Sequence, residues 1–310
     1  MNVLLAAEDA AGVQTLRRLQ TARHRLVAVL ASPERAKAPG SVWNVAKTLG
    51  HSCWPADLVR TPDLARRIRD ERIDVLINVH SLVLIHAEVL AAPPLGCFNL
   101  HPGPLPRYAG LNSVCWAIYH GETTHGVTLH RMTPDVDAGD IAYQAEVPIE
   151  AHDTGLTLAS RCVKAGVPLV LELLDTLADR PHDLPRRDQD RTRRTFFAAR
   201  PPNSGRLSWH APARQIVSFV RAADFVPFQS PWGHPRSFSG DLEVGIAKAR
   251  ETGEQCAAAP GTVRKSGNGH VDVAARDQWV AVQLIQTGGR YCAPDEVLAP
   301  GVILNGEPGS

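Results

Sequence analysis

The stretch Gly96-Cys-Phe-Asn-Leu-His-Pro-Gly-Pro-Leu-Pro-Arg-Tyr-Ala-Gly110 joins a short apolar strand to a stiff loop. The strand, residues 96–100, carries Asn99, and His101 follows it directly. The loop can continue as neither helix nor strand, because its prolines have no backbone N–H and a fixed φ. An amide and an imidazole that a strand delivers into a rigid, glycine-containing loop are typical of the rim of an active site.

A carboxylate motif, Asp137-Ala-Gly-Asp140, follows later in the chain at a turn. Taken singly, Asn99 could cap the end of a strand, and Asp137 could form an Asx turn before Gly139. Together with His101 they supply an oxyanion donor, an acid or base, and a carboxylate that orients the base. These are the groups that the transfer of an acyl-type group to an amine requires.

Three spaced motifs carry a resemblance to a known family. They are Phe98-Asn-Leu-His-Pro-x-x-Leu-Pro-x-Tyr-x-Gly110, Gly126-Val-Thr128 and Asp137-x-Gly-Asp140. Together they resemble the 10-formyltetrahydrofolate-dependent formyltransferases. That family includes methionyl-tRNA formyltransferase, glycinamide ribonucleotide transformylase, amino-sugar N-formyltransferases and the hydroxyornithine formyltransferases of siderophore pathways. The likeness runs from the first strand to about residue 177 and resumes more weakly beyond residue 206.

The resemblance implies that Asn99, His101 and Asp137 are the catalytic residues. Asn99 and a protonated His101 would donate hydrogen bonds to the negative oxygen that forms when an amine attacks the formyl carbon. Asp137 would orient the His101 ring, raise its pKa as a nearby opposite charge, and take up the proton that the amine sheds. Neither a metal nor a covalent enzyme intermediate is required.

The implied formyl donor is 10-formyltetrahydrofolate, with its pterin between residues 79–85, at the carboxyl end of a predicted strand, and residues 133–140. The residues expected to bind the donor are Ser81, Leu82, Val83, Leu84, Val136 and Asp140. Those expected to bind the acceptor are Tyr108, Asn112 and Ser113. The first βαβ unit lacks the Gly-x-Gly-x-x-Gly fingerprint, which argues against a nicotinamide or flavin dinucleotide.

The other histidines give weaker signals. His120, His125 and His130 are five residues apart, a spacing that matches neither one helix face nor a zinc site. We interpret them as solvated or core residues. His80 and His86 are weak candidates for direct ligands.

Composition narrows the class of protein. The formal net charge is +1, so the whole chain is no obvious binder of polyanions. The six cysteines show no CxxC pair and are typical of reduced thiols. The N-terminus is too short and too soon acidic for a signal peptide, and no apolar run approaches the roughly 20 residues that span a bilayer. We therefore expect a cytoplasmic protein without a membrane partner.

The fold class that we predict is α/β. Apolar runs at residues 3–7, 26–31 and 74–79 are typical of parallel strands buried on both faces. We expect a Rossmann-like formyltransferase domain over residues 1–180, a linker over 181–205 and a C-terminal domain over 206–310. The linker is rich in Arg and Pro and is interpreted as solvated, with an anionic partner as the alternative. Short strand-like runs between turns predict a small, OB-like β-barrel at the C-terminus.

Charge and loop length favour a small acceptor over tRNA. Residues 201–310 contain ten Lys plus Arg and ten Asp plus Glu, whereas a domain that grips tRNA should be basic. The loop at residues 32–40, where methionyl-tRNA formyltransferase has a long basic insertion, carries only Arg35 and Lys37. Gly103 also stands where such relatives have a serine.

We therefore expect a small amine as acceptor, with N5-hydroxyornithine, in siderophore or nonribosomal peptide biosynthesis, as the best candidate. The alternatives are methionyl-tRNA formyltransferase, an amino-sugar N-formyltransferase, a formyltetrahydrofolate hydrolase, and a folate-binding protein without turnover. The sequence gives no indication of an oligomeric state.

Overall fold

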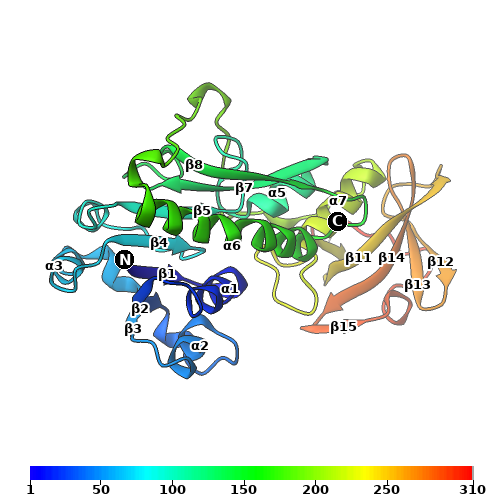
Figure 1. The fold of residues 1–310 in the computed structure, drawn as a ribbon. Coiled ribbons are helices and arrows are strands. Elements are labelled where there is room, and N and C mark those ends of the chain that lie inside the picture. The colour runs from blue at the N-terminus through cyan, green and yellow to red at the C-terminus, as the bar shows by residue number, and fades with distance from the viewer. Residues whose placement is uncertain (309–310) are drawn as a thin grey trace. The chain divides into compact units, whose positions relative to one another are not determined.

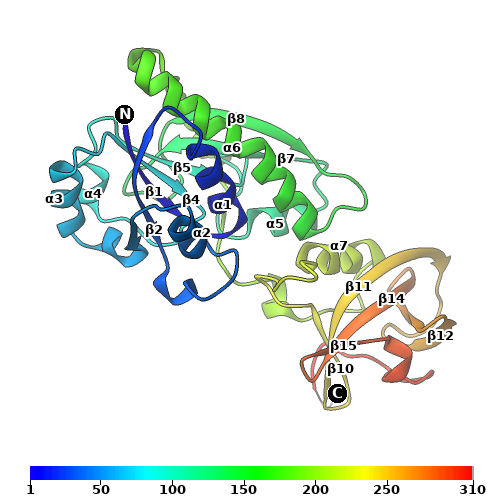
Figure 2. The same cartoon turned by 60° about the horizontal axis from the view of Figure 1, so that its bottom comes forward.

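The computed structural model describes residues 1–308, which form two compact units (Figures 1 and 2). The first unit comprises Met1–Gly110, Thr124–Pro148 and Ser160–Phe196. The second comprises Leu111–Thr123, Ile149–Ala159 and the chain from Phe197 onward. Each unit is described by itself.

The first unit is built on a seven-stranded sheet with the strand order β3-β2-β1-β4-β5-β7-β8. Its strands are β1 (Asn2–Ala7), β2 (Arg25–Ala31), β3 (Cys53–Pro55), β4 (Val75–Val79), β5 (Cys97–His101), β7 (Thr124–Arg131) and β8 (Ile141–Pro148). Strands β1 to β5 pair in parallel, and β7 and β8 join antiparallel at one edge. The carboxyl ends of β1, β4 and β5 therefore meet at one edge of the sheet, where ligands bind in open α/β folds.

Helices cover both faces of this sheet. They are α1 (Asp9–Leu19), α2 (Val42–Thr48), α3 (Asp63–Asp70), α4 (Ala87–Leu90) and α6 (Gly155–Asp179). Successive residues of a strand point to opposite faces. Leu5 accordingly packs in one core with α1, α2 and α6, and Leu4 packs in the other core with α3. Every side chain of β4 is buried, which explains why all of its residues except Asn78 are apolar.

Helix α6 packs closely against the strand that carries the catalytic candidates. A Cβ atom at Gly166 would lie 3.0 Å from the side chain of Leu100, so glycine permits this approach. Leu100 stands between Asn99 and His101 in β5 and points to the opposite face. The helix is a single element that contains Pro168. The short strands β6 (Ala109–Gly110) and β9 (Phe196–Phe197) lie where the chain passes between the units.

The second unit contains an antiparallel sheet with the order β10-β11-β14-β13-β12, and β15 pairs with β14. Its elements are α5 (Ser113–Tyr119), α7 (Ala213–Ala223), β10 (Arg236–Ser239), β11 (Leu242–Gln255), β12 (Val263–Gly267), β13 (His270–Ala274), β14 (Gln278–Thr287) and β15 (Arg290–Cys292). Strand β11, with 14 residues, is longer than the short strands that the sequence predicted. The fold class is confirmed: a Rossmann-like unit with a mainly parallel sheet, and a smaller C-terminal antiparallel unit.

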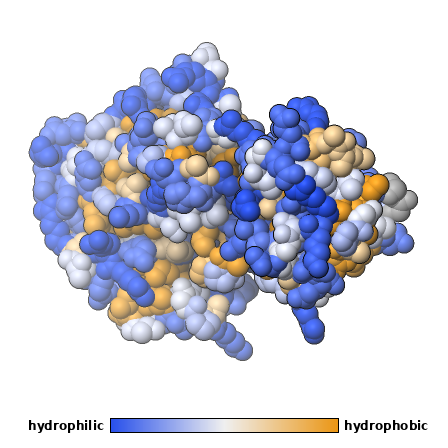
Figure 3. Space-filling view, turned by 90° about the vertical axis from the view of Figure 1, so that its right-hand side faces the viewer, coloured by the Kyte–Doolittle hydropathy of each residue, from blue (hydrophilic) through white to orange (hydrophobic). Residues whose placement is uncertain are grey.

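The surface mixes hydrophilic and apolar side chains. Figure 3 shows one face, on which hydrophilic residues are interrupted by small apolar groups. Within residues 1–308, no helix combines the length and the apolar character needed to cross a bilayer.

Candidate active site

Three polar side chains form a row across neighbouring strands of the first unit. The sheet register places Asn78 of β4 beside Asn99 of β5, and Asn99 beside His130 of β7. Asn78 Nδ2 donates to Asn99 Oδ1 at 2.8 Å, and Asn99 Nδ2 lies 3.2 Å from His130 Nε2. The register of the sheet therefore fixes the orientation of the Asn99 amide, with its Nδ2 group directed toward His130.

Asp137 approaches this row from the loop between β7 and β8. Its Oδ1 accepts a hydrogen bond from Asn99 Nδ2 at 3.3 Å and lies 3.3 Å from His130 Nε2. Its Oδ2 accepts from the backbone N–H of Gly110 at 2.9 Å and lies 3.5 Å from His101 Nδ1. The structure thus brings Asn99, His101 and Asp137 together, although they come from two distant motifs.

The His101 ring is buried, with Nε2 hydrogen-bonded and Nδ1 facing a carboxylate. Nε2 lies 2.7 Å from the carbonyl oxygen of Tyr108, and Nδ1 faces Asp137. Burial lowers the pKa of His101, and this effect outweighs the opposite effect of the Asp137 carboxylate. Asp137 does raise the pKa of His101, as expected, but the net shift is downward. The imidazole is neutral near pH 7.

Asp137 stays ionised near pH 7, because its partners outweigh the effect of its burial. Burial alone would raise its pKa, but His101, His130 and the Gly110 N–H together hold the pKa well below its usual range. A carboxylate with so low a pKa is a poor proton acceptor near pH 7. The role of proton acceptor that the sequence analysis assigned to Asp137 does not fit this environment.

His130 is a site residue that the sequence analysis missed. It was interpreted as a solvated or core histidine, and it is indeed buried. Its Nδ1 lies 2.9 Å from the carbonyl oxygen of Arg131, so Nδ1 carries a hydrogen and leaves Nε2 to face Asn99 and Asp137. The signal that reveals it is its position opposite Asn99 in the strand register, which no spacing along the chain could show.

Gly103 makes room for the catalytic ring. A Cβ atom at this position would lie 2.7 Å from His101 Nε2 and 2.8 Å from the carbonyl oxygen of Tyr108. It would therefore intrude on the hydrogen bond between these two atoms. There is therefore no room for a side chain at position 103 while the His101 ring contacts the Tyr108 carbonyl.

The loop residues expected to bind the donor fall into two groups. Leu82, Leu84 and Val136 are exposed, at 75%, 73% and 41% of their surface, and offer apolar contacts to a planar ligand. Ser81 is buried, and its carbonyl oxygen accepts from Asn78 Nδ2 at 3.1 Å, which ties the loop to the polar row. Val83 and Asp140 are partly buried.

His80 begins the same loop. Its φ is +58°, and burial lowers its pKa to about 4, although Asp9 acts in the opposite direction. His101 also lowers the pKa of His80, so the two rings are near each other. His86 instead caps α4, where its Nδ1 accepts from the Glu88 N–H.

The residues expected to bind the acceptor are divided between the units. Tyr108 is buried in the first unit, where its carbonyl oxygen contacts His101. Asn112 and Ser113 belong to the second unit. There the Asn112 amide donates to the carbonyl oxygen of Ala199 at 3.0 Å, and Ser113 is buried at the start of α5.

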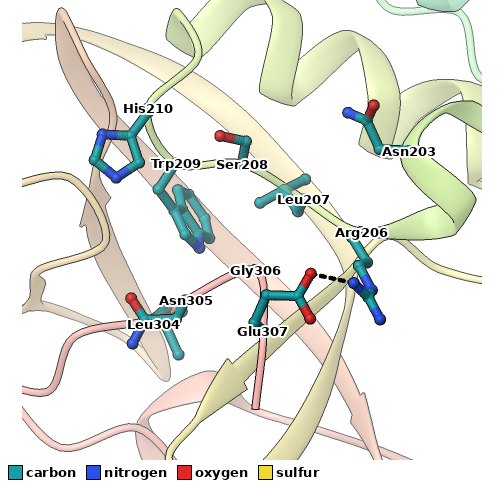
Figure 4. A pocket seen from close by; sticks show the side chains of 10 residues that line it. All are labelled: Asn203, Arg206, Leu207, Ser208, Trp209, His210, Leu304, Asn305, Gly306 and Glu307. Carbon is teal, nitrogen blue, oxygen red and sulfur yellow. Dashed lines mark hydrogen bonds and ion pairs between the residues drawn. The ribbon is translucent and has the colours of Figure 1, made fainter. Parts of the chain in front are cut away.

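The second unit has a separate pocket of about 330 Å³ (Figure 4). It is lined by Asn203, Arg206, Leu207, Ser208, Trp209, His210, Leu304, Asn305, Gly306 and Glu307. Its one carboxylate, Glu307, is paired with Arg206. In the described part of the chain, residues 1–308, no group of three or more His, Cys, Asp or Glu side chains is arranged to hold a metal ion.

Comparison with known proteins identifies the family. The formyl transferase family matches residues 9–174, and the C-terminal domain of formyl transferases matches residues 201–299. The first match alone covers more than half of the chain.

Solved structures with the same fold include HypX from Aquifex aeolicus in complex with tetrahydrofolic acid. It is 20% identical with a TM-score of 0.67, and the match covers 96% of this chain and 46% of HypX. An N-formyltransferase from Helicobacter canadensis, in complex with folinic acid and dTDP-3-aminofucose, is 16% identical with a TM-score of 0.68, and the match covers 91% and 98%. A 4-N formyltransferase from Francisella tularensis is 17% identical with a TM-score of 0.60, and the match covers 74% and 90%. The chain spans about half the length of HypX, and at these identities the likeness is one of fold.

Proposed function

Since the chain belongs to the formyl transferase family, we propose that it transfers a formyl group from 10-formyltetrahydrofolate to the amine nitrogen of a small molecule. The observation that carries the proposal is the joint contact of Asn99, His101 and Asp137 at the carboxyl end of β5. An amide donor, a neutral imidazole and an ionised carboxylate are the groups that this transfer needs.

In the proposed reaction the acceptor nitrogen attacks the formyl carbon, and the carbonyl oxygen becomes negative. The Asn99 amide now makes two long hydrogen bonds, at 3.2 and 3.3 Å. A negative oxygen at the usual 2.7–3.1 Å would be a stronger acceptor for one of these hydrogens. Asn99 is therefore our candidate for the oxyanion donor.

The proton that the acceptor loses goes, in our proposal, to His101 and not to Asp137. The Tyr108 carbonyl can only accept, so Nε2 of the ring carries a hydrogen and Nδ1 of the neutral ring has the free lone pair. The ionised Asp137 would stabilise the imidazolium that forms. The imidazolium then returns the proton to N10 of the folate, whose bond to the formyl carbon breaks.

The donor would lie along the exposed apolar residues Leu82, Leu84 and Val136. Two supports come from proteins of the same fold: HypX was solved with tetrahydrofolic acid, and the Helicobacter canadensis enzyme with folinic acid. Both ligands are reduced folates. A cytoplasmic location fits this proposal, because all six cysteines are free thiols.

The acceptor that we propose is N5-hydroxyornithine, of siderophore or nonribosomal peptide biosynthesis. An ordinary alkyl amine has a pKa near 10.4 and is almost wholly protonated at pH 7, whereas an N-hydroxylated nitrogen is far less basic and is ready to attack. The start of α1 supports an acceptor without phosphate. There Glu8 accepts from the Ser32 N–H at 2.6 Å and Asp9 pairs with Arg35 at 2.8 Å, so this helix end already holds carboxylates.

The test is to incubate the protein with 10-formyltetrahydrofolate and a set of acceptors, and to weigh the products by mass spectrometry. The acceptors are N5-hydroxyornithine, ornithine, lysine, a dTDP-amino sugar and charged initiator tRNA. We expect the fastest formylation with N5-hydroxyornithine. Faster transfer to the sugar nucleotide or to the tRNA would show that this compound, and not N5-hydroxyornithine, is the acceptor. Release of formate without any amine would indicate a hydrolase.

A further inference from the structure

Part of the arginine-rich segment after α6 packs against the catalytic loop. Ile141, the first residue of β8, and Arg187 exchange two backbone hydrogen bonds, at 2.9 and 3.1 Å. Both residues belong to the first unit. The sequence analysis interpreted this segment as a solvated linker, and the contacts described next show a different arrangement. We call Gln189, Arg194 and Thr195 the strap residues.

Two strap residues hold the backbone around Asp137. Gln189 Nε2 donates to the carbonyl oxygens of Asp137 and Gly139, at 3.0 and 2.7 Å. Arg194 donates through Nη1 to the carbonyl oxygen of Asp137 at 3.1 Å and through Nη2 to that of Val136 at 2.8 Å. Because both partners of Gln189 are carbonyl oxygens, its amide has only one satisfactory orientation.

The third strap residue holds the other side of the site. Thr195 Oγ1 accepts from the backbone N–H of Tyr108 at 2.8 Å, and its carbonyl oxygen accepts from the N–H of Ala109 at 3.0 Å. Both backbones that the strap residues hold are strained. Asp137 has φ +51° and Tyr108 has φ +59°, in the left-handed region where side-chain-bearing residues persist only when surrounding contacts fix them.

The two strained residues are the two partners of the catalytic ring. His101 Nε2 contacts the carbonyl oxygen of Tyr108, and His101 Nδ1 faces the carboxylate of Asp137. We propose that Gln189, Arg194 and Thr195 are positioning residues for the formyl transfer: they fix the backbones of Asp137 and Tyr108, and through them the ring of His101. The effect on rate rests on the proposed function, whereas the effect on the ring does not.

Arg194 adds a charge to this arrangement. Burial has the largest effect on the pKa of His101. The charged groups that also act on it are Asp137 from the loop after β7, His130 from β7, and Arg194. His80, from the loop after β4, is also near the ring. Asp137 raises the pKa of His101, while His130 and Arg194 lower it. We therefore expect removal of the Arg194 cation to shift the titration of His101 upward.

The experiment compares Arg194→Gln, Arg194→Lys and Gln189→Ala with Arg193→Gln. Arg193 is the exposed neighbour of Arg194 and serves as the matched control. Two quantities are measured for each folded variant: kcat and KM for the donor with the best acceptor, and the titration of the His101 ring by NMR of histidine-labelled protein. The NMR signal that is missing in His101→Gln identifies the signal of His101.

We expect Arg194→Gln to lower kcat at least tenfold with KM within twofold, and to move the His101 titration to higher pH. Arg194→Lys keeps the cation, so the titration of His101 should stay near that of the unchanged protein. Its kcat should fall, because lysine cannot make the two hydrogen bonds that the guanidinium donates. Gln189→Ala should lower kcat without moving the titration upward. A loss of one well-placed contact can cost up to about a hundredfold in rate.

The proposal is overturned if Arg194→Gln loses rate without any change in the titration, because the loss would then not arise at the His101 ring. It is also overturned if kcat and titration both stay as in Arg193→Gln. Should Arg194→Gln fail to fold, Arg194→Lys and Gln189→Ala test the proposal in its place. An unchanged kcat in both of these variants refutes the proposal. Should no acceptor be formylated at all, the proposed function fails, and the titration still tests the effect on the ring.

Discussion

The Nε2 atom of His101 lies 2.7 Å from the carbonyl oxygen of Tyr108, and this contact decides which ring nitrogen is free for chemistry. A carbonyl oxygen only accepts, so the hydrogen of the neutral ring sits on Nε2 and the lone pair on Nδ1. Nδ1 is the atom that faces Asp137. The predictions below follow from this arrangement and from the loops around it.

Replacing either member of the His101–Asp137 pair should abolish most of the turnover. His101→Ala removes the proposed base, and Asp137→Asn removes the anion that stabilises the imidazolium. Each should lower kcat by about a hundredfold or more while the fold survives. Steady-state rates, with circular dichroism to check folding, measure this, and His152→Ala at an exposed turn is the control. A folded His101→Ala protein with near-normal rate contradicts the role of His101.

Gly103→Ser should impair catalysis more than donor binding. The new Cβ would lie 2.7 Å from His101 Nε2, so the ring must leave the Tyr108 carbonyl. We expect kcat to fall at least tenfold, because small displacements of catalytic groups are costly. Affinity for 5-formyltetrahydrofolate, measured by calorimetry, should change less than threefold. Equal kcat in the variant would mean that the contact between His101 and Tyr108 is dispensable.

A charge in the proposed donor slot should weaken folate binding. Leu82→Asp and Val136→Asp change exposed side chains, so neither should unfold the protein. Each places an ionised group where an apolar ring would pack, and we expect Kd for a reduced folate to rise at least tenfold, or about 1.4 kcal/mol. Phe228→Asp, in the second unit and 64% exposed, is the control. Tight binding of NAD with no binding of folate would refute this slot.

Stability should fall as the pH drops from about 6.5 toward 4, partly because of His80. Its pKa is about 4 in the folded protein and near 6.5 when unfolded, so in this window the unfolded chain binds the extra proton. Each pH unit then costs about 1.4 kcal/mol of unfolding free energy for this group. The lowered pKa of His101 acts in the same direction.

Urea unfolding at pH 7, 6 and 5 measures this dependence. His80→Gln should flatten the pH slope, because the group that titrates is gone, and His152→Gln, at an exposed turn, serves as the control. Parallel slopes in His80→Gln and the unchanged protein would contradict the lowered pKa of His80.

The resemblance to the formyltransferases predicted that the two catalytic motifs act together, and the structure brings their side chains into contact. The residues alone predicted a strand that delivers Asn99 and His101 into a proline-rich loop at the carboxyl edge of a parallel sheet, and that strand is β5. Buried strands such as β4 can also be predicted from sequence, because burial on both faces leaves a run that is apolar apart from Asn78.

The parts that escaped prediction depend on contacts between distant residues. His130 faces Asn99 only because β7 pairs antiparallel with β5 in one register. The function of Gln189 and Arg194 follows from carbonyl groups some fifty residues earlier. The direction of the His101 pKa was also beyond sequence reasoning, because it is a balance between burial and a nearby charge, and only the folded structure supplies the depth of burial.

The row of Asn78, Asn99 and His130 has a consequence for the order in which the active site is assembled during synthesis. Asn99 is held on one side as soon as β4 and β5 pair, but its other partner arrives only when β7 has left the ribosome and joined the sheet. The strap residues emerge later still, after the whole of α6. All seven strands of the first sheet are therefore synthesised before the strap residues, and a chain that ends before Gln189 lacks the side chains that hold the backbone of Asp137.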